Sequence, residues 1–301
     1  MRFCVRTCLV GVLAMAVAGV SPASAQGDVP GIQVELTTLT DRLMPMQPIR
    51  LIVRVANVSV EPVRGWFILH ANAGRCGLMV EGEGLTRHVN SREMTPNRLA
   101  AGDYLPPARP MTYEPGYERT LDLIALYDRD AADYLFPIPG RYDLRFWVQF
   151  FTGTGLDDYK PVHLISDTVS LNIEEPEGER FASRVWRLPW GMPQQFSGSP
   201  VTSGFSDVSG TSYEQYARFA MSGWSEIARA ERIRILEELA DGPPPQQIAD
   251  LVMLRLAELL LAENDHARAA EWARKVEEMP GALPHVVSRA AQLRQEAERR
   301  D

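Results

Sequence analysis

The five histidines are the residues best suited to carry chemistry, and their spacing does not bring any two of them together. A zinc site on a helix or hairpin needs two imidazoles a few residues apart, as at i and i+4. The histidines are His70, His88, His163, His266 and His285. The sequence therefore predicts no histidine metal centre.

Motifs of known enzyme classes are missing as well. The chain has no HExxH pair, no GxSxG elbow, no P-loop and no GxGxxG after a strand. The stretch YDRDAADY, with Asp128, Asp130 and Asp133, has the acid count of a calcium loop but not the EF-hand spacing. We interpret it as a solvated bend. Carboxylate pairs for glycoside hydrolysis are set by distance in space, so the sequence identifies none. We predict no catalytic residue, metal or cofactor.

Three tryptophans are the candidate binding residues. Trp186 and Trp190 lie in residues 177–211, a linker-like segment rich in Ser and Gly. Their rings could form a platform for sugars or peptides, or wedge two domains together, and we favour the wedge because it buries apolar area. Trp147 is the one large ring on the polar face of its strand. We expect the helices or a partner to cover it.

One cysteine remains if the N-terminal segment is removed. Cys76 could act as a nucleophile or form an intermolecular bridge. It alternates with Leu78 and Val80, however, as on the inward face of a strand. We interpret it as a small buried hydrophobic residue with a structural role.

The first 25 residues resemble a secretory signal peptide. Arg2 and Arg6 precede an apolar stretch over Leu9–Val20, and Ala23–Ala25 offers small residues for cleavage. The stretch is shorter than the roughly 20 residues of a spanning helix. We expect cleavage after Ala25 and a periplasmic or secreted protein. No later stretch is apolar enough to span a membrane.

The charge balance argues against some partners. The chain has 31 Lys and Arg against 39 Asp and Glu, a formal net charge of −8. A negative chain does not favour nucleic acid or an anionic membrane surface. The expected partner is a protein or peptide of the cell envelope.

The first half alternates apolar and polar residues with period two, which is typical of strands. The expected strands are 32–38, 49–57, 63–70, 76–80, 85–89, 120–126, 136–150 and 162–173. The strand over 136–150 is the clearest, and its inward residues are Tyr142, Leu144, Phe146, Val148 and Phe150. Strands at this spacing without helices between them indicate a β-sandwich.

The segment Gly140–Leu144 (GRYDL) resembles the tyrosine corner of immunoglobulin-like domains. In that family the Tyr142 hydroxyl would bond to upstream backbone, and Trp66 would be the core tryptophan. Leu144 stands where the family has cysteine, so its disulfide is absent. The resemblance covers about residues 31–175 and implies a fold but no activity. Residues 90–117 form a long connection, either a functional loop or the crossing between sheets.

From Ser212 the apolar period changes to about 3.6, which predicts helices to the end of the chain. This helical part, about 90 residues, resembles tetratricopeptide-like repeats, and the second of two units matches better. The matching positions are Leu256, Ala257, Asn264, Asp265, Ala269 and Pro280. The resemblance implies a surface that binds protein or peptide. The alternative is a plain helical hairpin packed on the sandwich.

These observations predict a multidomain chain, with an all-β immunoglobulin-like sandwich and an all-α domain of helical hairpins. Its parts are a signal peptide (1–25), the sandwich (26–176), a linker (177–211) and the helical domain (212–301). The function that fits is a non-enzymatic binding or scaffold protein for a protein or peptide partner. The alternatives are a secreted hydrolase with its site in loop 90–117, and a sandwich that inhibits a protease.

Overall fold

The structure is a computed structural model. It describes residues 29–45, 47–70, 74–94, 110–125, 127–128, 133–152, 160–174, 212–223 and 227–300. The predicted signal peptide, the linker with Trp186 and Trp190, and most of loop 90–117 lie outside these ranges. So do Asp130 and the side chains of Asp128 and Asp133.

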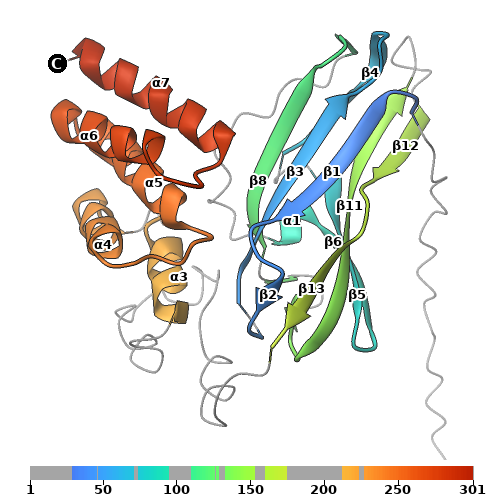
Figure 1. Cartoon of the computed structure of the whole chain (residues 1–301), viewed down its shortest axis with the longest axis horizontal. Helices are drawn as coiled ribbons and strands as arrows, with labels where there is room; N and C mark the ends of the chain where they lie inside the picture. Colours follow the sequence, from blue (N-terminus) through green and yellow to red (C-terminus); the bar gives the residue numbers. More distant parts are fainter. Residues whose placement is uncertain are drawn as a thin grey trace, which may run out of the picture.

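A region of two sheets is followed by a region of helices (Figure 1). The smaller sheet has the order β1 (Ile32–Thr38), β3 (Ile49–Asn57), β8 (Glu118–Ala125), all antiparallel. The larger sheet contains β2 (Arg42–Leu43), β4 (Val63–Phe67), β5 (Cys76–Gly82), β6 (Leu85–Asn90), β7 (Met111–Tyr113), β11 (Gly140–Thr152), β12 (Lys160–Ile165) and β13 (Val169–Ile173). A short helix, α1 (Ser91–Met94), follows β6, and β9 (Tyr127–Asp128) pairs with β10 (Asp133–Tyr134).

Strand β11 organises the larger sheet. One of its edges pairs with β13 and then β12, and the other pairs with β5 and then β4. The residues predicted to point inward, Tyr142, Leu144, Phe146, Val148 and Phe150, are all fully buried. They belong to one core together with inward residues of β1, β3 and β8. The predicted alternation along this strand is confirmed.

The predicted strand over 162–173 is two strands, with Ser166 at the break. The Ser166 backbone N–H donates to the Phe146 carbonyl at 2.9 Å, and the Ser166 hydroxyl accepts from the Phe146 N–H at 2.9 Å. A side chain thus replaces a backbone group in the ladder, and β12 and β13 share one edge of β11 without being continuous.

Tyr142 forms the hydrogen bond that the tyrosine corner implies. Its ring is fully buried, and its hydroxyl donates to the backbone carbonyl of Ile138 at 3.0 Å. The bond ties the loop before β11 to the strand itself.

Changing Tyr142 to phenylalanine should remove this bond and keep the packing of the ring. We expect the free energy of unfolding to fall by about 1 kcal/mol, the usual net contribution of one hydrogen bond. Urea denaturation measures the loss. The matched control is Tyr117→Phe, in a loop of the same sheet region and less buried. An unchanged free energy for Tyr142→Phe would contradict the role of the bond.

Trp66 does not occupy the core position that the family resemblance predicts. On β4 the residues that point inward are Gly65 and Phe67, and Trp66 is half-buried on the opposite face. Its ring stacks on Phe151, with centroids 3.8 Å apart. The register of β4 is therefore one residue away from the prediction, since neighbouring strand residues face opposite ways. Phe67 contributes the aromatic ring to the core instead.

Cys76 lies where the alternation of β5 predicts, fully buried in the core. Burial raises the pKa of its thiol to about 11, against weaker opposing hydrogen bonds with Ser91 and the His70 carbonyl. The thiol is therefore protonated at neutral pH and sealed from solvent, which suits a structural role.

The helical region comprises α3 (Ser212–Met221), α4 (Arg229–Asp241), α5 (Ala249–Ala262), α6 (His266–Glu277) and α7 (Pro284–Arg300). Helices α5 and α6 join through a tight turn in which Asn264 has a positive φ of 63°. The Asp265 side chain then caps α6 by accepting from the Arg268 N–H. Leu256, Ala257 and Ala269 are fully buried between the helices. Within the described ranges no helix is both long and apolar enough to cross a membrane.

Candidate functional site

The helices pack against the outer face of the smaller sheet (Figure 1). Ile124, on the outward face of β8, belongs to the apolar core of the helices and not to that of the sheets. The side chains of β3 and β8 that face outward therefore form the floor of an interface between the two regions.

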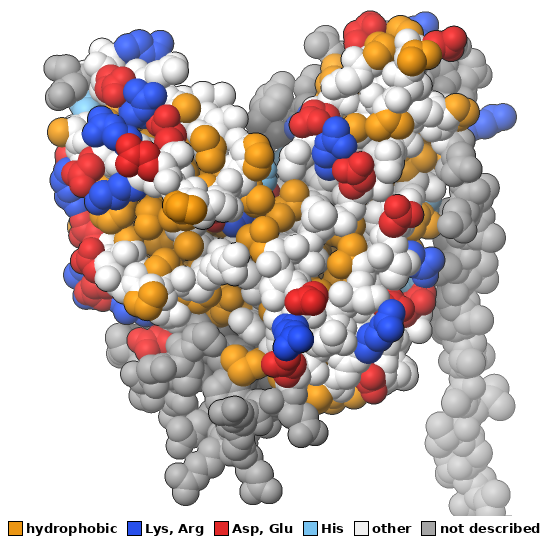
Figure 2. All heavy atoms as spheres, viewed as in Figure 1, with side chains coloured by type: hydrophobic (Ala, Val, Ile, Leu, Met, Phe, Trp, Pro, Cys, Tyr) orange, Lys and Arg blue, Asp and Glu red, His pale blue; other side chains and the backbone are white. Residues whose placement is uncertain are grey.

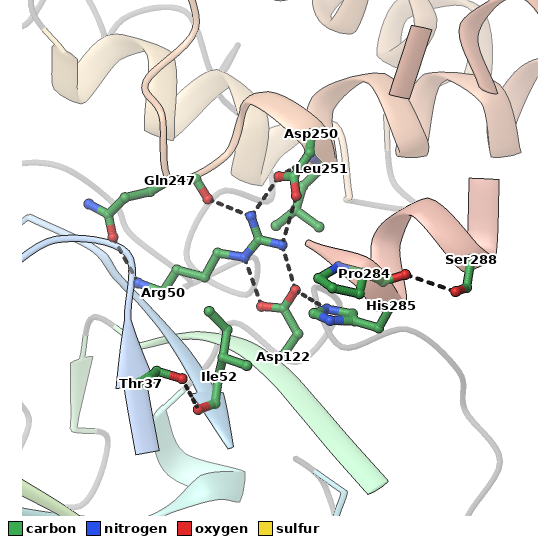
Figure 3. Close-up of polar contacts among 10 residues, drawn as sticks. All are labelled: Thr37, Arg50, Ile52, Asp122, Gln247, Asp250, Leu251, Pro284, His285 and Ser288. Carbon is green, nitrogen blue, oxygen red and sulfur yellow. Dashed lines mark hydrogen bonds and ion pairs between the residues drawn. The ribbon is translucent and has the colours of Figure 1, made fainter. Parts of the chain in front are cut away.

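Arg50 is the centre of this interface (Figure 3). Its side chain is 0% exposed and projects from β3 toward the helices. The guanidinium group donates two hydrogen bonds to Asp122 of β8, at 2.8 and 2.6 Å. It donates two more to Asp250 in the first turn of α5, at 2.6 and 3.2 Å. Two bidentate pairs thus join the sheet to the helices through one cation.

Gln247 closes the network from the helical side. The side-chain amide oxygen of Gln247 accepts a hydrogen bond from the Arg50 backbone N–H at 2.9 Å. The backbone carbonyl of Gln247 accepts a second bond from the Arg50 guanidinium at 3.1 Å. The Gln247 amide also donates to the Pro48 carbonyl and to the Tyr216 hydroxyl. The Tyr216 hydroxyl in turn accepts from the side chain of Gln47. The loop before α5 is fixed to the start of β3 by side-chain and backbone bonds together.

The electrostatics of the cluster favour the ionised forms of Asp122 and Arg50. Burial alone would raise the pKa of Asp122, but its bonds to Arg50 and His285 outweigh burial and lower the pKa from its ordinary value. Burial alone would lower the pKa of Arg50, and its two aspartates raise it instead. Each buried charge is held in its charged form by the other.

His285, in the first turn of α7, marks the end of the buried cluster. Its Nε2 atom lies 2.8 Å from an Asp122 carboxylate oxygen, and its side chain is 34% exposed. Beyond it the helix and the sheet diverge and leave a groove of about 570 Å³. Figure 2 shows the surface notched between the two regions.

The floor of the groove is the outer face of the smaller sheet. The strand register places Thr37, Ile52 and Asp122 in one row, next to the row of Arg50 and Ile124 that the helices cover. The next row outward is Glu35, Arg54 and Thr120, and Glu118 lies one row further along β8. One wall comes from α7, with Ser288, Arg289 and Gln292. Most of the lining residues are therefore polar, and both regions of the chain contribute to the groove.

Ser288, His285 and Asp122 lie near one another but are not arranged as a catalytic triad. The Ser288 hydroxyl donates to the Pro284 carbonyl of its own helix at 2.8 Å, and not to the imidazole. The His285 nitrogen that faces Asp122 belongs to the Arg50 cluster (Figure 3). In a triad the base would accept from the nucleophile.

Of the three predicted binding residues, the structure describes only Trp147. It is half-buried on the outer face of the larger sheet, where its ring stacks on His163 and lies over Gly77. The helices pack on the other sheet, so they do not cover Trp147. The described residues that contact its ring, His163 and Gly77, belong to its own sheet. Of loop 90–117, the described parts are Asn90 with α1 and residues 110–117.

The sequence interpretation missed the residues of the interface. The alternation in the strand over 49–57 places Arg50 on the outward face, which is the correct face, but it does not show that the helices bury that face. A signal was present in Ile52 and Ile124, two large apolar residues on outward positions of neighbouring strands. Such residues indicate that something covers that face of the sheet.

The fold places the chain among proteins with a two-sheet β region followed by helices. No protein-family model matches it, and no curated protein matches it. Distant structural matches contain β-sandwiches. One is Spo0M, the sporulation control protein from Bacillus subtilis, with 11% identity over 52% of this chain and a TM-score of 0.29. The matched region spans 54% of the length of Spo0M.

Two further matches are equally distant. The C-terminal domain of Wzt has 14% identity over 52% of this chain and 80% of its own, with a TM-score of 0.28. Escherichia coli α2-macroglobulin has 11% identity over 89% of this chain and 22% of its own, with a TM-score of 0.25.

Proposed function

We propose that this chain is a non-enzymatic binding protein that holds a protein or peptide segment in the groove between the smaller sheet and α7. In this proposal the sheets form an immunoglobulin-like sandwich and the helices a tetratricopeptide-like pair with flanking helices. The protein works in the periplasm or outside the cell, after cleavage behind Ala25. Trp186 and Trp190 belong to the linker between the two parts.

The observation that supports this proposal most is the construction of the groove. Its floor and wall come from different regions of the chain, and the buried Arg50 cluster fixes their relative position at one end. A binding site whose walls are already in place loses less entropy when a ligand enters. Hydroxyl, amide and charged groups along the lining offer partners to the polar backbone of a peptide.

Filling the groove should weaken peptide binding. We expect peptides selected on the wild-type protein from a phage-displayed library of random 12-residue sequences to bind the Ser288→Trp/Gln292→Trp variant at least about tenfold more weakly, since indole rings would occupy the space of the peptide. Fluorescence polarisation with the labelled peptides gives the dissociation constants.

The matched control is Gln295→Trp, because Gln295 is exposed on the same helix but does not line the groove. This variant should bind as the wild type does. Equal losses in both variants, or no loss in either, would place the binding site elsewhere. A library that yields no binding peptide would contradict the proposed function.

A further inference from the structure

The charge on the groove floor is unbalanced. Arg54 is the guanidinium group of the floor, and it pairs with two carboxylates, Glu35 at 3.0 Å and Glu118 at 2.8 Å. The cation on the wall, Arg289, is paired with Glu258 at 3.2 Å. One negative charge of the floor is thus left without a compensating cation among the described residues.

Both glutamates also keep one carboxylate oxygen available. Every bond from Arg54 to them uses the Oε2 atom, on Glu35 as on Glu118. Among the described residues no hydrogen bond reaches either Oε1 atom. The side chains of Glu35 and Glu118 are 43% and 55% exposed, so a ligand can reach both.

The positions of these groups fit a side chain that enters from the open end. The strand register places Glu35 and Glu118 on the outer rows of the floor, beyond Ile52 and away from the N-terminus of α7. The positive end of that helix dipole therefore lies at the closed end, next to Asp122. A cation in the outer rows meets carboxylates and avoids the helix terminus.

Resting on the proposed function, we infer that the occupant of the groove is a polypeptide segment carrying a lysine or arginine, whose cationic group binds the free oxygens of Glu35 and Glu118. An ammonium or guanidinium group donates several hydrogen bonds and neutralises the surplus charge. Ile52, in the row next to that of Glu35 and Arg54, offers apolar surface to the aliphatic stem of such a side chain.

The test selects peptides from the same random library on the wild-type protein and on the Glu35→Gln/Glu118→Gln variant. The expected result is enrichment of lysine or arginine at one position on the wild type and none on the variant. Replacing that residue by norleucine in the selected peptide should weaken binding to the wild type about tenfold, and to the double variant less than about twofold.

Arg54→Gln provides a change in the opposite direction. It removes the competing cation and leaves both carboxylates, so affinity for the basic peptides should rise several-fold at low salt and less at high salt. A gain in affinity cannot come from misfolding.

The possible outcomes distinguish a failure of this inference from a failure of the proposed function. Selected peptides that lose binding in Ser288→Trp/Gln292→Trp but show no basic residue would overturn the inference and leave the proposed function standing. Basic peptides that bind the Glu35→Gln/Glu118→Gln variant as well as the wild type would also overturn it. A library without any binder would overturn both.

Discussion

Replacing Arg50 by methionine is expected to lower the free energy of unfolding by about 3–5 kcal/mol. The change keeps a long side chain but removes the one cation that Asp122 and Asp250 share. Both carboxylates, 14% and 5% exposed, would then stay in the interface without their main partner. Urea denaturation followed by far-ultraviolet circular dichroism measures the loss.

The chain offers a matched control on the same strand. Arg54 points to the same face of β3 and also pairs with two carboxylates, but its side chain is 39% exposed. Exposed pairs contribute about 0–1 kcal/mol, so Arg54→Met should change the free energy of unfolding little. Similar losses for the two variants would contradict the view that burial makes the Arg50 cluster important.

A triple variant distinguishes the energy of the bonds between Arg50 and its aspartates from the cost of burying unpaired carboxylates. In Arg50→Met/Asp122→Asn/Asp250→Asn no buried charge of the cluster is left unpaired. We expect this variant to regain much of the stability lost in Arg50→Met, because the main cost of that single change is the burial of unpaired carboxylates. A triple variant as unstable as the single one would mean that the bonds themselves carry the energy.

Acid should weaken the interface through Asp122. Its pKa is lower in the folded protein than the ordinary value of 3.8, so its ionisation stabilises the folded state above that pH. The contribution is lost as the pH falls below 3.8 toward the folded pKa. At neutral pH we expect Asp122→Asn to cost about 3 kcal/mol, since Arg50 keeps only Asp250 as a charged partner.

The measurement is the free energy of unfolding of both proteins from pH 7 to pH 2. The two curves should run apart at neutral pH and converge below pH 3.8. Asp167→Asn, at an exposed loop position, serves as the control and should follow the wild type throughout. Parallel curves for Asp122→Asn and the wild type over the whole range would show that Asp122 is not the group that titrates.

Alternation of apolar residues was enough to predict the longer strands. In β11 every second residue from Tyr142 to Phe150 is large and apolar, so its inward face follows from one rule. The rule failed where the ladder changes locally. Ser166 interrupts the predicted strand 162–173, because its hydroxyl accepts a hydrogen bond from the Phe146 N–H. The spacing of apolar residues does not predict such a bond. Trp66 was assigned to the core by resemblance, while Gly65 and Phe67 hold the inward positions.

The candidate site could not be predicted from the sequence for a different reason. Its charged cluster is assembled from four elements that are far apart in the sequence, β3, β8, α5 and α7. No local sequence pattern relates the four residues, which are Arg50, Asp122, Asp250 and His285. A charged residue on the outward face of a strand is solvated in most sheets, so a single sequence gives no ground to bury it. Only the docking of the helices turns that face into an interface.

The Arg50 cluster also sets an order of events during synthesis. The bond between Arg50 and Asp250 joins residues 200 positions apart, and His285 comes later still. All strands of both sheets precede α3 to α7 in the chain, so the sheets can assemble before Gln247 and Asp250, the partners of Arg50 on the helical side, have been made. Until then Arg50 and Ile124 face water on an uncovered sheet. A chain that lacks its last helices would expose this face of the sheet to other proteins, and docking of the completed helices would bury it. Nascent chains stalled before residue 247 should therefore bind holdase chaperones more than the finished protein does.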